Sequence, residues 1–495
     1  MTSRSTRIIH GGLRYLEHGE IGLVRESLRE RERLLRERSH LVQPTQFLVL
    51  LNEQSRRSAL KVRIGLWLYQ RLAGRKSNNN VGEMELKRVE RALDAGHRWS
   101  IFNYEDAQCE FPERLVAEWL TEAIDAGAVV RNHAEVLAVN VAHGRARGVV
   151  FRDRITGKDA RVDAAWVVNC AGPWADRICQ RSSIRTAKPM LGGVRGSHIV
   201  LPRFPAAPSN PLYTEAADGR PIFVVPWNEQ LMVGTTEVAD TGDPGRTEPS
   251  AEETGYLLSS VTKLFPKAKL SANDVKYAFA GVRPLPYSDG NRPSAVTRRH
   301  FLHDHTSEGA ARMISVIGGK LTTAASLARE CVRKIGIAVS EPTSVSVGPG
   351  VALDPMLDQA VIEIAQAGSV SEESARGMVE WYGKRAMDIA RMALVSAELR
   401  APICPHSSHV VAEVVEAYRR ECAVSLADVL LRRVPVALGS CWSESCSREA
   451  ALRIGAVLGW DEQTLGANLE AFETERASFL HRISGRPSAL EAAAD

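Results

Sequence analysis

Two stretches near the start of the chain repeat apolar residues at the spacing of an α-helix. Between residues 20 and 38, Ile21, Val24, Leu28 and Leu35 alternate with arginine and glutamate. This pattern predicts an amphipathic helix with a densely charged outer face. A second helix is predicted over residues 59–72, where an i, i+4 row of apolar residues lies beside a tryptophan: Leu60, Ile64, Leu68, Leu72 and Trp67.

The second predicted helix is basic as well as amphipathic. Arginine and lysine flank its apolar row at positions 56, 57, 61, 63 and 71. A basic amphipathic helix with an aromatic residue can lie in the interface of a bilayer. The alternative is a helix packed on the core with a basic outer face, and the pattern alone leaves both open. Residues 74–82, with three consecutive asparagines, predict a loop.

From residue 115 onward the pattern becomes that of an α/β fold. A helix over 115–126 ends at Gly127, and strands are predicted at 128–131, 135–140 and 146–152. A further β-run over 161–169 leads into Val167-Val168-Asn169-Cys170-Ala171-Gly172-Pro173-Trp174. A strand that breaks on glycine before a helix brings backbone N–H groups close to a ligand.

The rest of the chain divides into a sheet and a helical region. Residues 192–237 predict an antiparallel sheet with strands at 196–201, 222–226 and 230–234 and a turn near Asn228. Composition changes at 341–353, a segment rich in Pro, Gly, Ser and Val, and residues 355–480 are helical by pattern. We therefore expect one domain over residues 1–345 and an all-α domain over 354–482.

Composition and charge exclude several classes of protein. The net charge of +4 gives no reason to expect nucleic-acid binding, although Met1 to Lys76 holds sixteen Lys and Arg against seven Asp and Glu. There is no apolar stretch typical of a signal peptide or of a membrane span. We therefore expect a cytoplasmic protein or one on the inner face of a membrane. Its basic N-terminal region favours anionic lipids or anionic substrates.

The eight cysteines do not form a disulfide framework. Cys441 and Cys446 are five residues apart, and His406 and His409 lie near Cys404, but no spacing matches a known zinc pattern. The sequence therefore predicts reduced, mostly buried cysteines and no metal site.

Six motifs, in the same order, resemble the aerobic, respiratory family of FAD-dependent glycerol-3-phosphate dehydrogenases. The first is Ser3-Arg4-Ser5-Thr6-Arg7-Ile8-Ile9-His10-Gly11-Gly12-Leu13-Arg14-Tyr15-Leu16. The others are residues 104–108 (YEDAQ), 194–200 (VRGSHIV), 226–227 with 233–236 (PW and VGTT), 281–285 (GVRPL) and 318–323 (GGKLTT). Matches continue through the helical region, for example at residues 426–433 (LADVLLRR).

This resemblance implies a fold, a cofactor and a reaction. The fold would be α/β followed by all-α: a Rossmann-like FAD/NAD(P)-binding domain with an antiparallel substrate-binding sheet, and then the helical C-terminal domain. The reaction would be FAD-dependent oxidation of sn-glycerol 3-phosphate to dihydroxyacetone phosphate, with electrons passed to a quinone. A glycerol-3-phosphate oxidase using O₂ would share nearly every motif.

The resemblance also assigns roles to individual residues. A histidine suits the base that takes the C2 hydroxyl proton, and His10 is the corresponding position. Arg283 and Lys320 are further catalytic candidates, and a phosphate dianion favours guanidinium groups. The substrate-binding candidates are Arg14, Tyr15, Arg283 and Arg298. The simpler alternative for His10 is a structural histidine, and for the arginines it is a surface charge. For Arg298 a surface charge and a role in phosphate binding are about equally weighted.

The expected FAD contacts fall into three groups. Hydroxyls of Ser3, Ser5 and Thr6 would bond near the pyrophosphate and ribityl chain. The backbone of Val136 would meet the adenine. Two segments would pass beneath the cofactor, and their residues are Ala171, Gly172, Gly319, Lys320, Leu321 and Thr322.

One element of the family pattern is missing from the sequence. No G-x-G-x-x-G triplet follows a strand, although this fingerprint places a helix N-terminus against the FAD pyrophosphate. We expect the sequence to be N-terminally truncated by roughly forty residues, the usual size of that βαβ unit, through a misplaced start codon. The alternative from a different class is a flavin-free, inactive remnant that serves as a binding or scaffold protein.

The partners that this interpretation implies are glycerol 3-phosphate, a quinone and the inner-membrane surface, with no nucleic acid. The basic helix at 59–72 favours a quinone in a membrane over O₂ in solution. The C-terminal domain could brace the fold or mediate self-association as a homodimer.

Overall fold

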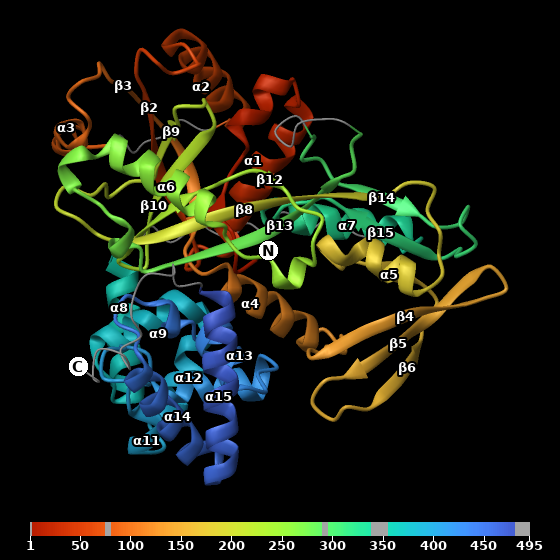
Figure 1. Cartoon of the computed structure of the whole chain (residues 1–495). Helices are drawn as coiled ribbons and strands as arrows, with labels where there is room; N and C mark the ends of the chain where they lie inside the picture. Colours follow the sequence, from red (N-terminus) through yellow and green to blue (C-terminus); the bar gives the residue numbers. More distant parts are fainter. Residues whose placement is uncertain (1, 75–80, 290–295, 338–354, 481–495) are drawn as a thin grey trace, which may run out of the picture.

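The computed structural model describes residues 2–74, 81–289, 296–337 and 355–480. Figure 1 shows a β-rich part built around one long sheet and a separate bundle of helices formed by the C-terminal third of the chain. The predicted class, α/β followed by all-α, is confirmed. The predicted linker at 341–353 and most of the loop predicted at 74–82 lie outside the described residues.

A nine-stranded sheet forms the centre of the β-rich part. Its order is β1-β3-β2-β9-β10-β11-β8-β12, with β13 also paired to β8. All of these pairs are antiparallel except β2 with β9. The strands are β1 (Ile8–Ile9), β2 (Val42–Leu51), β3 (Ser100–Cys109), β8 (Leu191–Pro202), β9 (Leu212–Glu215), β10 (Pro221–Trp227), β11 (Gln230–Gly234), β12 (Val238–Ala239) and β13 (Tyr277–Pro286).

The antiparallel strands predicted between residues 192 and 237 are present, and β10 and β11 form the predicted hairpin. Asn228 and Glu229 both have positive φ, 48° and 58°, as a two-residue turn of this kind requires. Strands β2 and β3 were not predicted, although their ten-residue pairing runs from Val42 opposite Cys109 to Leu51 opposite Ser100. Polar and charged residues, among them Asp106, interrupt the apolar pattern of β3.

Helices cover the sheet, and the two near the start of the chain agree with their predicted ranges. They are α1 (Ile21–Glu37) and α2 (Ala59–Ala73). The others are α3 (Glu83–Ala92), α4 (Pro112–Asp125), α5 (Ala175–Arg181), α6 (Ala251–Leu264) and α7 (Ala324–Lys334). Helix α4 begins three residues before the predicted start, because Pro112 occupies its first turn, where a missing N–H costs nothing.

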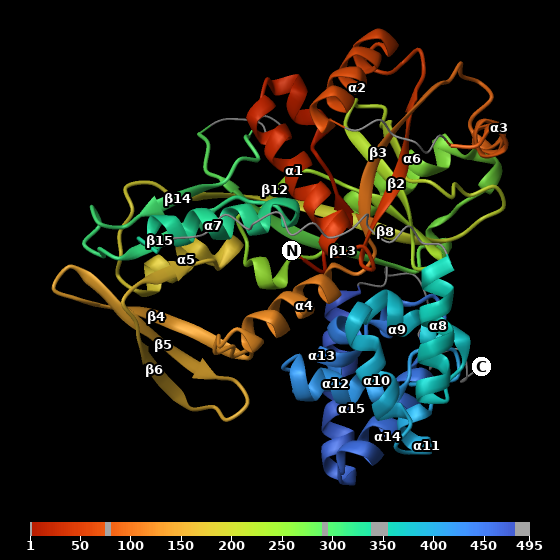
Figure 2. The ribbon, with the colours of Figure 1, turned by 180° about the vertical axis from the view of Figure 1, so that it is seen from behind.

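The structure decides between the two interpretations that the pattern of α2 left open. Leu66 and Tyr69 are buried, whereas Leu60, Ile64 and Trp67 are 64%, 57% and 58% exposed. The apolar row noted in the sequence therefore lies partly in solvent instead of on the core. Figures 1 and 2 both place α2 at the edge of the molecule farthest from the helical bundle. None of the helices in the described ranges is long and apolar enough to cross a bilayer.

Two three-stranded sheets flank the main one. The first is a meander of β4 (Ala134–Ala142), β5 (Arg145–Asp153) and β6 (Asp159–Asp163). The second has the order β14-β15-β7, formed by Phe301–Asp304, Met313–Ile317 and Val167–Asn169, and β15 runs parallel to β7. The predicted β-run at 161–169 is therefore two strands in different sheets, and the strand predicted at 128–131 is irregular because the chain there only leads from α4 to β4.

The C-terminal part is helical, as predicted. Its helices are α8 (Pro355–Gly368), α9 (Glu372–Tyr382), α10 (Ala386–Ala393), α11 (Ala397–Arg400), α12 (Val411–Arg420), α13 (Leu426–Asp428), α14 (Glu444–Leu458) and α15 (Glu462–Phe479). One hydrophobic cluster joins this bundle to the main sheet, because Trp227 and Phe279 pack in it with Trp381 and Leu430.

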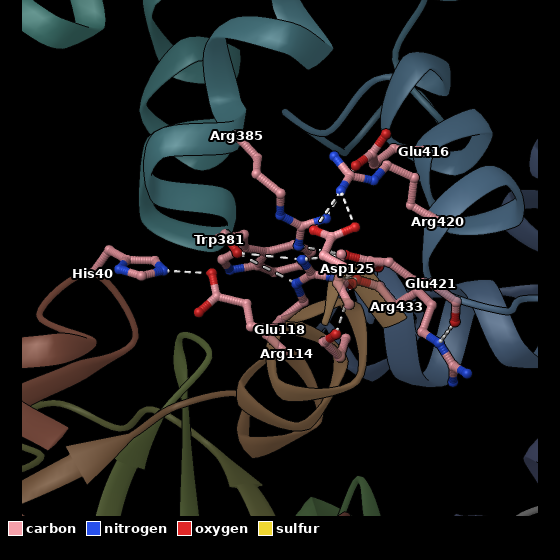
Figure 3. A network of polar contacts seen from close by, with 12 residues as sticks. His40, Arg114, Glu118, Asp125, Trp381, Arg385, Glu416, Arg420, Glu421 and Arg433 are labelled. Carbon is pink, nitrogen blue, oxygen red and sulfur yellow. Dashed lines mark hydrogen bonds and ion pairs between the residues drawn. The ribbon is translucent and has the colours of Figure 1, made fainter. Parts of the chain in front are cut away.

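A buried ion pair links α4 to the helical bundle (Figure 3). The Arg114 guanidinium donates to both carboxylate oxygens of Glu421, at 2.6 and 2.9 Å, and both side chains are fully buried. Arg114 also donates to the carbonyl of Arg433 at 2.7 Å and lies 4.2 Å from the centre of the Tyr382 ring. At the margin of the same interface, Arg420 pairs with Asp125 through exposed side chains.

Candidate functional site

The loop that carries His10 owes its path to two glycines. It follows β1 and leads into the short helix η1 (Leu13–His18). Gly12 has a φ of 82°, in the left-handed region that side chains disfavour. A Cβ on Gly11 would lie 2.3 Å from the Tyr69 hydroxyl oxygen and 2.4 Å from Leu28 Cδ2. The glycines therefore let the backbone pass directly against the α1 and α2 helices.

Asp106 anchors this loop from β3. Its carboxylate accepts hydrogen bonds from the Gly11 N–H at 3.1 Å, from Arg31 Nη1 at 2.7 Å and from the Tyr69 hydroxyl at 2.9 Å. Burial raises the pKa of Asp106, and the Arg31 guanidinium opposes that shift. Asp106 lies in the motif at residues 104–108, but its role was not predicted from the sequence. Its place in that motif was the available signal.

The candidate substrate residues come together beside the loop. Arg283 Nη2 donates to Thr235 Oγ1 at 2.9 Å, and Arg298 Nη2 lies 2.8 Å from Glu237 Oε1. Burial, together with the charges of Arg298 and Arg14, lowers the pKa of Arg283 to about 10. Among the described residues, Arg298 Nη1 and Arg14 Nε are buried without a hydrogen-bond partner. Three guanidinium groups thus converge with spare donors, which suits an anion.

Lys320 and Tyr15 border the same cluster. Lys320 Nζ donates to Ser27 Oγ at 2.6 Å and lies 4.6 Å from the centre of the Tyr15 ring. Burial lowers the pKa of Lys320 to about 8. Burial also raises the pKa of the Tyr15 hydroxyl, so it remains protonated at neutral pH. Both groups can therefore donate hydrogen bonds to a ligand.

His10 is neutral in this surrounding. Burial, which removes the hydration of the His10 ring, is the main cause that lowers its pKa to about 3, and the positive charges of Lys320 and Arg14 also lower it. Its ring lies 6.1 Å from the Tyr15 ring, centre to centre. A neutral imidazole keeps a lone pair, so it can accept a proton. The structure therefore brings all the predicted catalytic and substrate residues into one cluster, and their roles remain predictions.

His198 is a residue of this region that the sequence analysis missed. Its ring stacks on Phe279 at 5.0 Å, and Nε2 lies 3.0 Å from Thr6 Oγ1. Nδ1 is buried without a partner among the described residues, and burial lowers the pKa of His198 to about 3. His198 lies in the motif at residues 194–200 on β8. Only its contact with Thr6, in the N-terminal loop, shows that it faces the site.

The predicted FAD contacts are spread over two places. Val136 and Ala171 line one cavity of about 640 Å³. Gly319, with a φ of 100°, leads into η7 (Leu321–Thr323), which packs on α1 close to the cationic cluster. At the N-terminus Ser5 accepts from the backbone N–H of Arg7, and Arg4 donates to the carbonyl of Thr247 at 3.4 Å.

The cavity suits the adenosine half of a dinucleotide. Cofactor pockets commonly enclose about 300 to 1,000 Å³ and are mostly apolar, with a few placed polar groups. Valines line one part of it. The arginines Arg154, Arg177 and Arg181 line another part, where Glu135 and Asp243 of the same lining pair with them. The apolar walls fit an aromatic base, so the valine side of the cavity is compatible with the adenine of FAD.

Comparisons with known proteins agree with this arrangement. Residues 1–329 match the family described as FAD dependent oxidoreductase, and residues 348–465 match the C-terminal domain of alpha-glycerophosphate oxidase. The chain is 35% identical over 456 residues to a glycerol-3-phosphate dehydrogenase of Synechocystis, with 88% of this chain and 82% of the relative covered. It is 33% identical over 378 residues to the aerobic glycerol-3-phosphate dehydrogenase of Escherichia coli, with 73% and 70% covered.

Two further relatives bear on substrate and fold. A D-erythritol 1-phosphate dehydrogenase of Brucella abortus is 36% identical over 337 residues, with 68% of this chain and 66% of the relative covered. The crystal structure of a glycerol-3-phosphate dehydrogenase from Bacillus halodurans, complexed with FAD, superposes with a TM-score of 0.75. That superposition covers 98% of this chain and 89% of the other at 22% identity, so it supports the fold.

Proposed function

Because this chain belongs to the FAD-dependent oxidoreductases of the glycerol-3-phosphate dehydrogenase family, we propose that it oxidises sn-glycerol 3-phosphate to dihydroxyacetone phosphate and passes the electrons to a quinone. The observation that carries the proposal is the convergence of Arg14, Arg283 and Arg298 beside a neutral His10. These groups match the two ends of the substrate, a phosphate dianion and a hydroxyl that must lose its proton.

The arginine cluster binds and orients the phosphate. Guanidinium groups form paired, directional hydrogen bonds with phosphate oxygens. Glu237 holds Arg298 at 2.8 Å and lies 3.8 Å from Arg283 Nη1, so it fixes both side chains before the substrate arrives. Anchoring one end of a short polyol in this way places the C2 carbon at a defined distance from the cluster.

His10 accepts the proton of the C2 hydroxyl. The charges of Lys320 and Arg14 contribute to its depressed pKa, after the loss of hydration. A bound phosphate dianion offsets those positive charges, so we expect substrate binding to raise the pKa of His10 toward its ordinary value. The base therefore becomes stronger when its substrate is in place. Asp106 keeps the loop in position through the Gly11 N–H.

The chain's own residues would hold FAD at the places described above. Val136 and Ala171 would hold the adenosine, and the segment from Gly319 to Thr322 would contact the cofactor near the cationic cluster. The bound flavin would supply the acceptor for the hydride of C2. Lys320 belongs to this segment, and its ammonium, which donates to Ser27 Oγ, would supply positive charge that favours electron-rich states nearby.

The exposed face of α2 supports a peripheral membrane location on the cytoplasmic side. Leu60, Ile64 and Trp67 point into solvent, and exposed cations of the same helix (Lys61, Arg63 and Arg71) surround them. Its inner face carries Tyr69, whose hydroxyl donates a hydrogen bond to Asp106, the residue that holds the His10 loop. The helix therefore connects a lipid-compatible surface with the site, and this favours a membrane quinone as electron acceptor.

The test begins with purified protein and its flavin absorbance. We expect a yellow protein whose absorbance bleaches with glycerol 3-phosphate, with dihydroxyacetone phosphate as product. A colourless protein, or one that the substrate does not bleach, would contradict the proposed reaction and favour the inactive remnant. Because one relative is a D-erythritol 1-phosphate dehydrogenase, D-erythritol 1-phosphate is the competing substrate to compare by kcat/KM.

The acceptor is tested separately in vesicles that contain anionic lipid and a quinone. We expect Ile64→Glu and Trp67→Glu to lose vesicle flotation and quinone reduction but to retain reduction of a soluble dye. Leu394→Glu is the matched control, since that side chain is 53% exposed in the helical bundle. Unchanged flotation of the α2 variants would contradict the membrane assignment.

A second candidate acceptor is O₂. The match of residues 348–465 to the C-terminal domain of alpha-glycerophosphate oxidase favours it. Hydrogen peroxide formed stoichiometrically with dihydroxyacetone phosphate, at a rate that added quinone does not change, would identify an oxidase.

A further inference from the structure

Far along the sequence from the proposed catalytic site, two cysteines and a histidine meet inside the helical domain. Cys404 and His406 lie in the loop between α11 and α12, and Cys446 lies in the first turn of α14. The ligand atoms of these three residues all lie within 4.8 Å of one another. Cys404 and Cys446 are each 1% exposed, so they form the floor of the cluster, while His406 covers it from the solvent side.

The spacing of these atoms matches a tetrahedral zinc centre. Zinc binds sulfur at about 2.3 Å and imidazole nitrogen at about 2.0 to 2.1 Å, so the tetrahedral edge between them measures about 3.6 Å. Cys446 Sγ lies 3.6 Å from His406 Nδ1. The two atoms therefore already stand at the separation that a shared zinc ion requires.

Cys441 lies beside the cluster without being part of it. Its carbonyl oxygen lies 3.8 Å from Cys446 Sγ, and its exposed side chain belongs to the segment before α14. The ligand atoms that lie within 4.8 Å of one another are those of Cys404, His406 and Cys446.

From this geometry we propose that Cys404, His406 and Cys446 bind a zinc ion. Two thiolates and one imidazole would occupy three of its four tetrahedral positions, and the exposed side of the cluster, at His406, leaves the fourth position to solvent. Soft sulfur ligands in a tetrahedral arrangement select zinc over magnesium or calcium. Each thiol releases its proton to solvent as the metal–sulfur bond forms.

The position of Cys446 in the first turn of α14 favours its thiolate form. Its sulfur accepts a hydrogen bond from the Ser443 hydroxyl at 3.3 Å. Ser443 is the N-cap of α14 and accepts from the Cys446 N–H. A thiol at the start of a helix is stabilised as thiolate by the N–H groups there.

The ion would join the two domains more firmly. The segment before Cys441 carries Leu438, whose carbonyl accepts from Gln230 at 3.2 Å and from the Tyr277 hydroxyl at 3.1 Å. Both donors belong to the main sheet. Joining Cys446, at the start of the helix that follows this segment, to the loop of Cys404 would therefore stabilise a contact between the helical domain and the β-rich part.

The test is zinc binding by the full-length protein, reduced and stripped of metal with a chelator. We expect one equivalent of zinc per chain in competition with a chromophoric chelator. Cobalt should give the intense visible bands of a tetrahedral thiolate site. Cys404→Ser and Cys446→Ser should each weaken zinc binding by more than about 100-fold, since loss of even an outer-shell partner costs 10- to 100-fold.

Cys422→Ser is the matched control, because Cys422 is a partly buried cysteine of the same domain that is not in the cluster. It should bind zinc as the unaltered chain does. Thiol protection on the unaltered chain avoids any failure of the variants to fold: zinc should slow the alkylation of Cys404 and Cys446. Zinc binding that survives in the Cys404→Ser/Cys446→Ser double variant would overturn the proposal and point to the other group, His303, His305 and Glu308. A Cys404–Cys446 disulfide as the ground state would also overturn it.

Discussion

Replacing Arg114 by methionine tests whether the buried ion pair holds the two domains together. The change removes two charge-assisted hydrogen bonds to Glu421, one to the carbonyl of Arg433 and the stacking on Tyr382. Glu421 keeps Arg385 at 2.7 Å, so it is not left wholly unpaired. Breaking a buried pair from one side costs about 3 to 5 kcal/mol. Because the Arg385 contact remains, we expect the free energy of unfolding to fall by about 3 kcal/mol, near the lower end of that range.

The exposed pair at the same interface provides the control. Arg420 contacts both oxygens of Asp125 at 2.9 and 2.8 Å, but its side chain is 39% exposed and that of Asp125 59%. Exposed pairs contribute about 0 to 1 kcal/mol, so Arg420→Met should change stability by no more than that. The two pairs differ chiefly in burial, although Arg114 uses two nitrogens on the carboxylate and Arg420 uses one.

The assay is urea unfolding followed by tryptophan fluorescence, since Trp381 lies at this interface and its carbonyl accepts from Arg114. A chain of two domains need not unfold in one step, so the first transition is compared among the three proteins. Equal shifts below about 1 kcal/mol in both variants would refute the reasoning that burial makes the Arg114 pair important.

The same pair predicts a dependence on pH. Burial alone would raise the pKa of Glu421, but Arg114 and Arg385 hold it below the ordinary value. The stabilisation is therefore present above the unfolded-state pKa of about 4.3. It is lost as the pH falls through the lower folded-state value. The difference between the unaltered chain and Arg114→Met should shrink in acid, and a constant difference down to the folded-state value would contradict this explanation.

Three further predictions concern the proposed site. Arg283→Leu should raise KM for glycerol 3-phosphate by roughly 10- to 150-fold, the loss of one hydrogen bond to a charged group, whereas an unchanged KM would remove Arg283 from phosphate binding. Gly11→Ala should destabilise the protein by about 1 to 3 kcal/mol through overpacking, because the new Cβ would meet the Tyr69 hydroxyl at 2.3 Å; thermal unfolding measures this. The pKa of Lys320 is about 8, so activity that needs its ammonium should fall as pH rises through 8, and Lys320→Arg should abolish that fall; a fall that persists in the variant assigns it to another group.

Several elements could be predicted from the sequence because their signals are local. The helices at 21–37 and 59–73 show their periodicity within a few turns, and the turn residues of the β10–β11 hairpin indicate that hairpin. The motifs around His10, Arg283 and Lys320 identified the candidate site residues as a set. Chemistry that depends on residue type, such as guanidinium for phosphate, can be inferred without coordinates.

Other features depended on contacts between distant segments. Strands β2 and β3 were missed because β3 buries a charged residue, Asp106, which breaks the apolar pattern on which strand prediction depends. The outward face of α2 was not decided by its periodicity, since a helix with apolar residues on more than one side can pack by any of them. Tertiary packing selected Leu66 and Tyr69 for the core and left Trp67 in solvent.

The sequence by itself therefore determined the fold class, the helical C-terminal domain and the residue types of the site. The tertiary structure decided which of those residues meet. Arg114 and Glu421 are 307 positions apart and Cys446 is 40 from His406, so no local pattern links them. A pattern along the chain shows only which nearby residues lie on the same face of one helix or strand, or in the same turn. The pairing of distant charges and ligands arises from the packing of whole elements, and this is the physical reason that the ion pair and the cysteine–histidine cluster became visible only in the folded molecule.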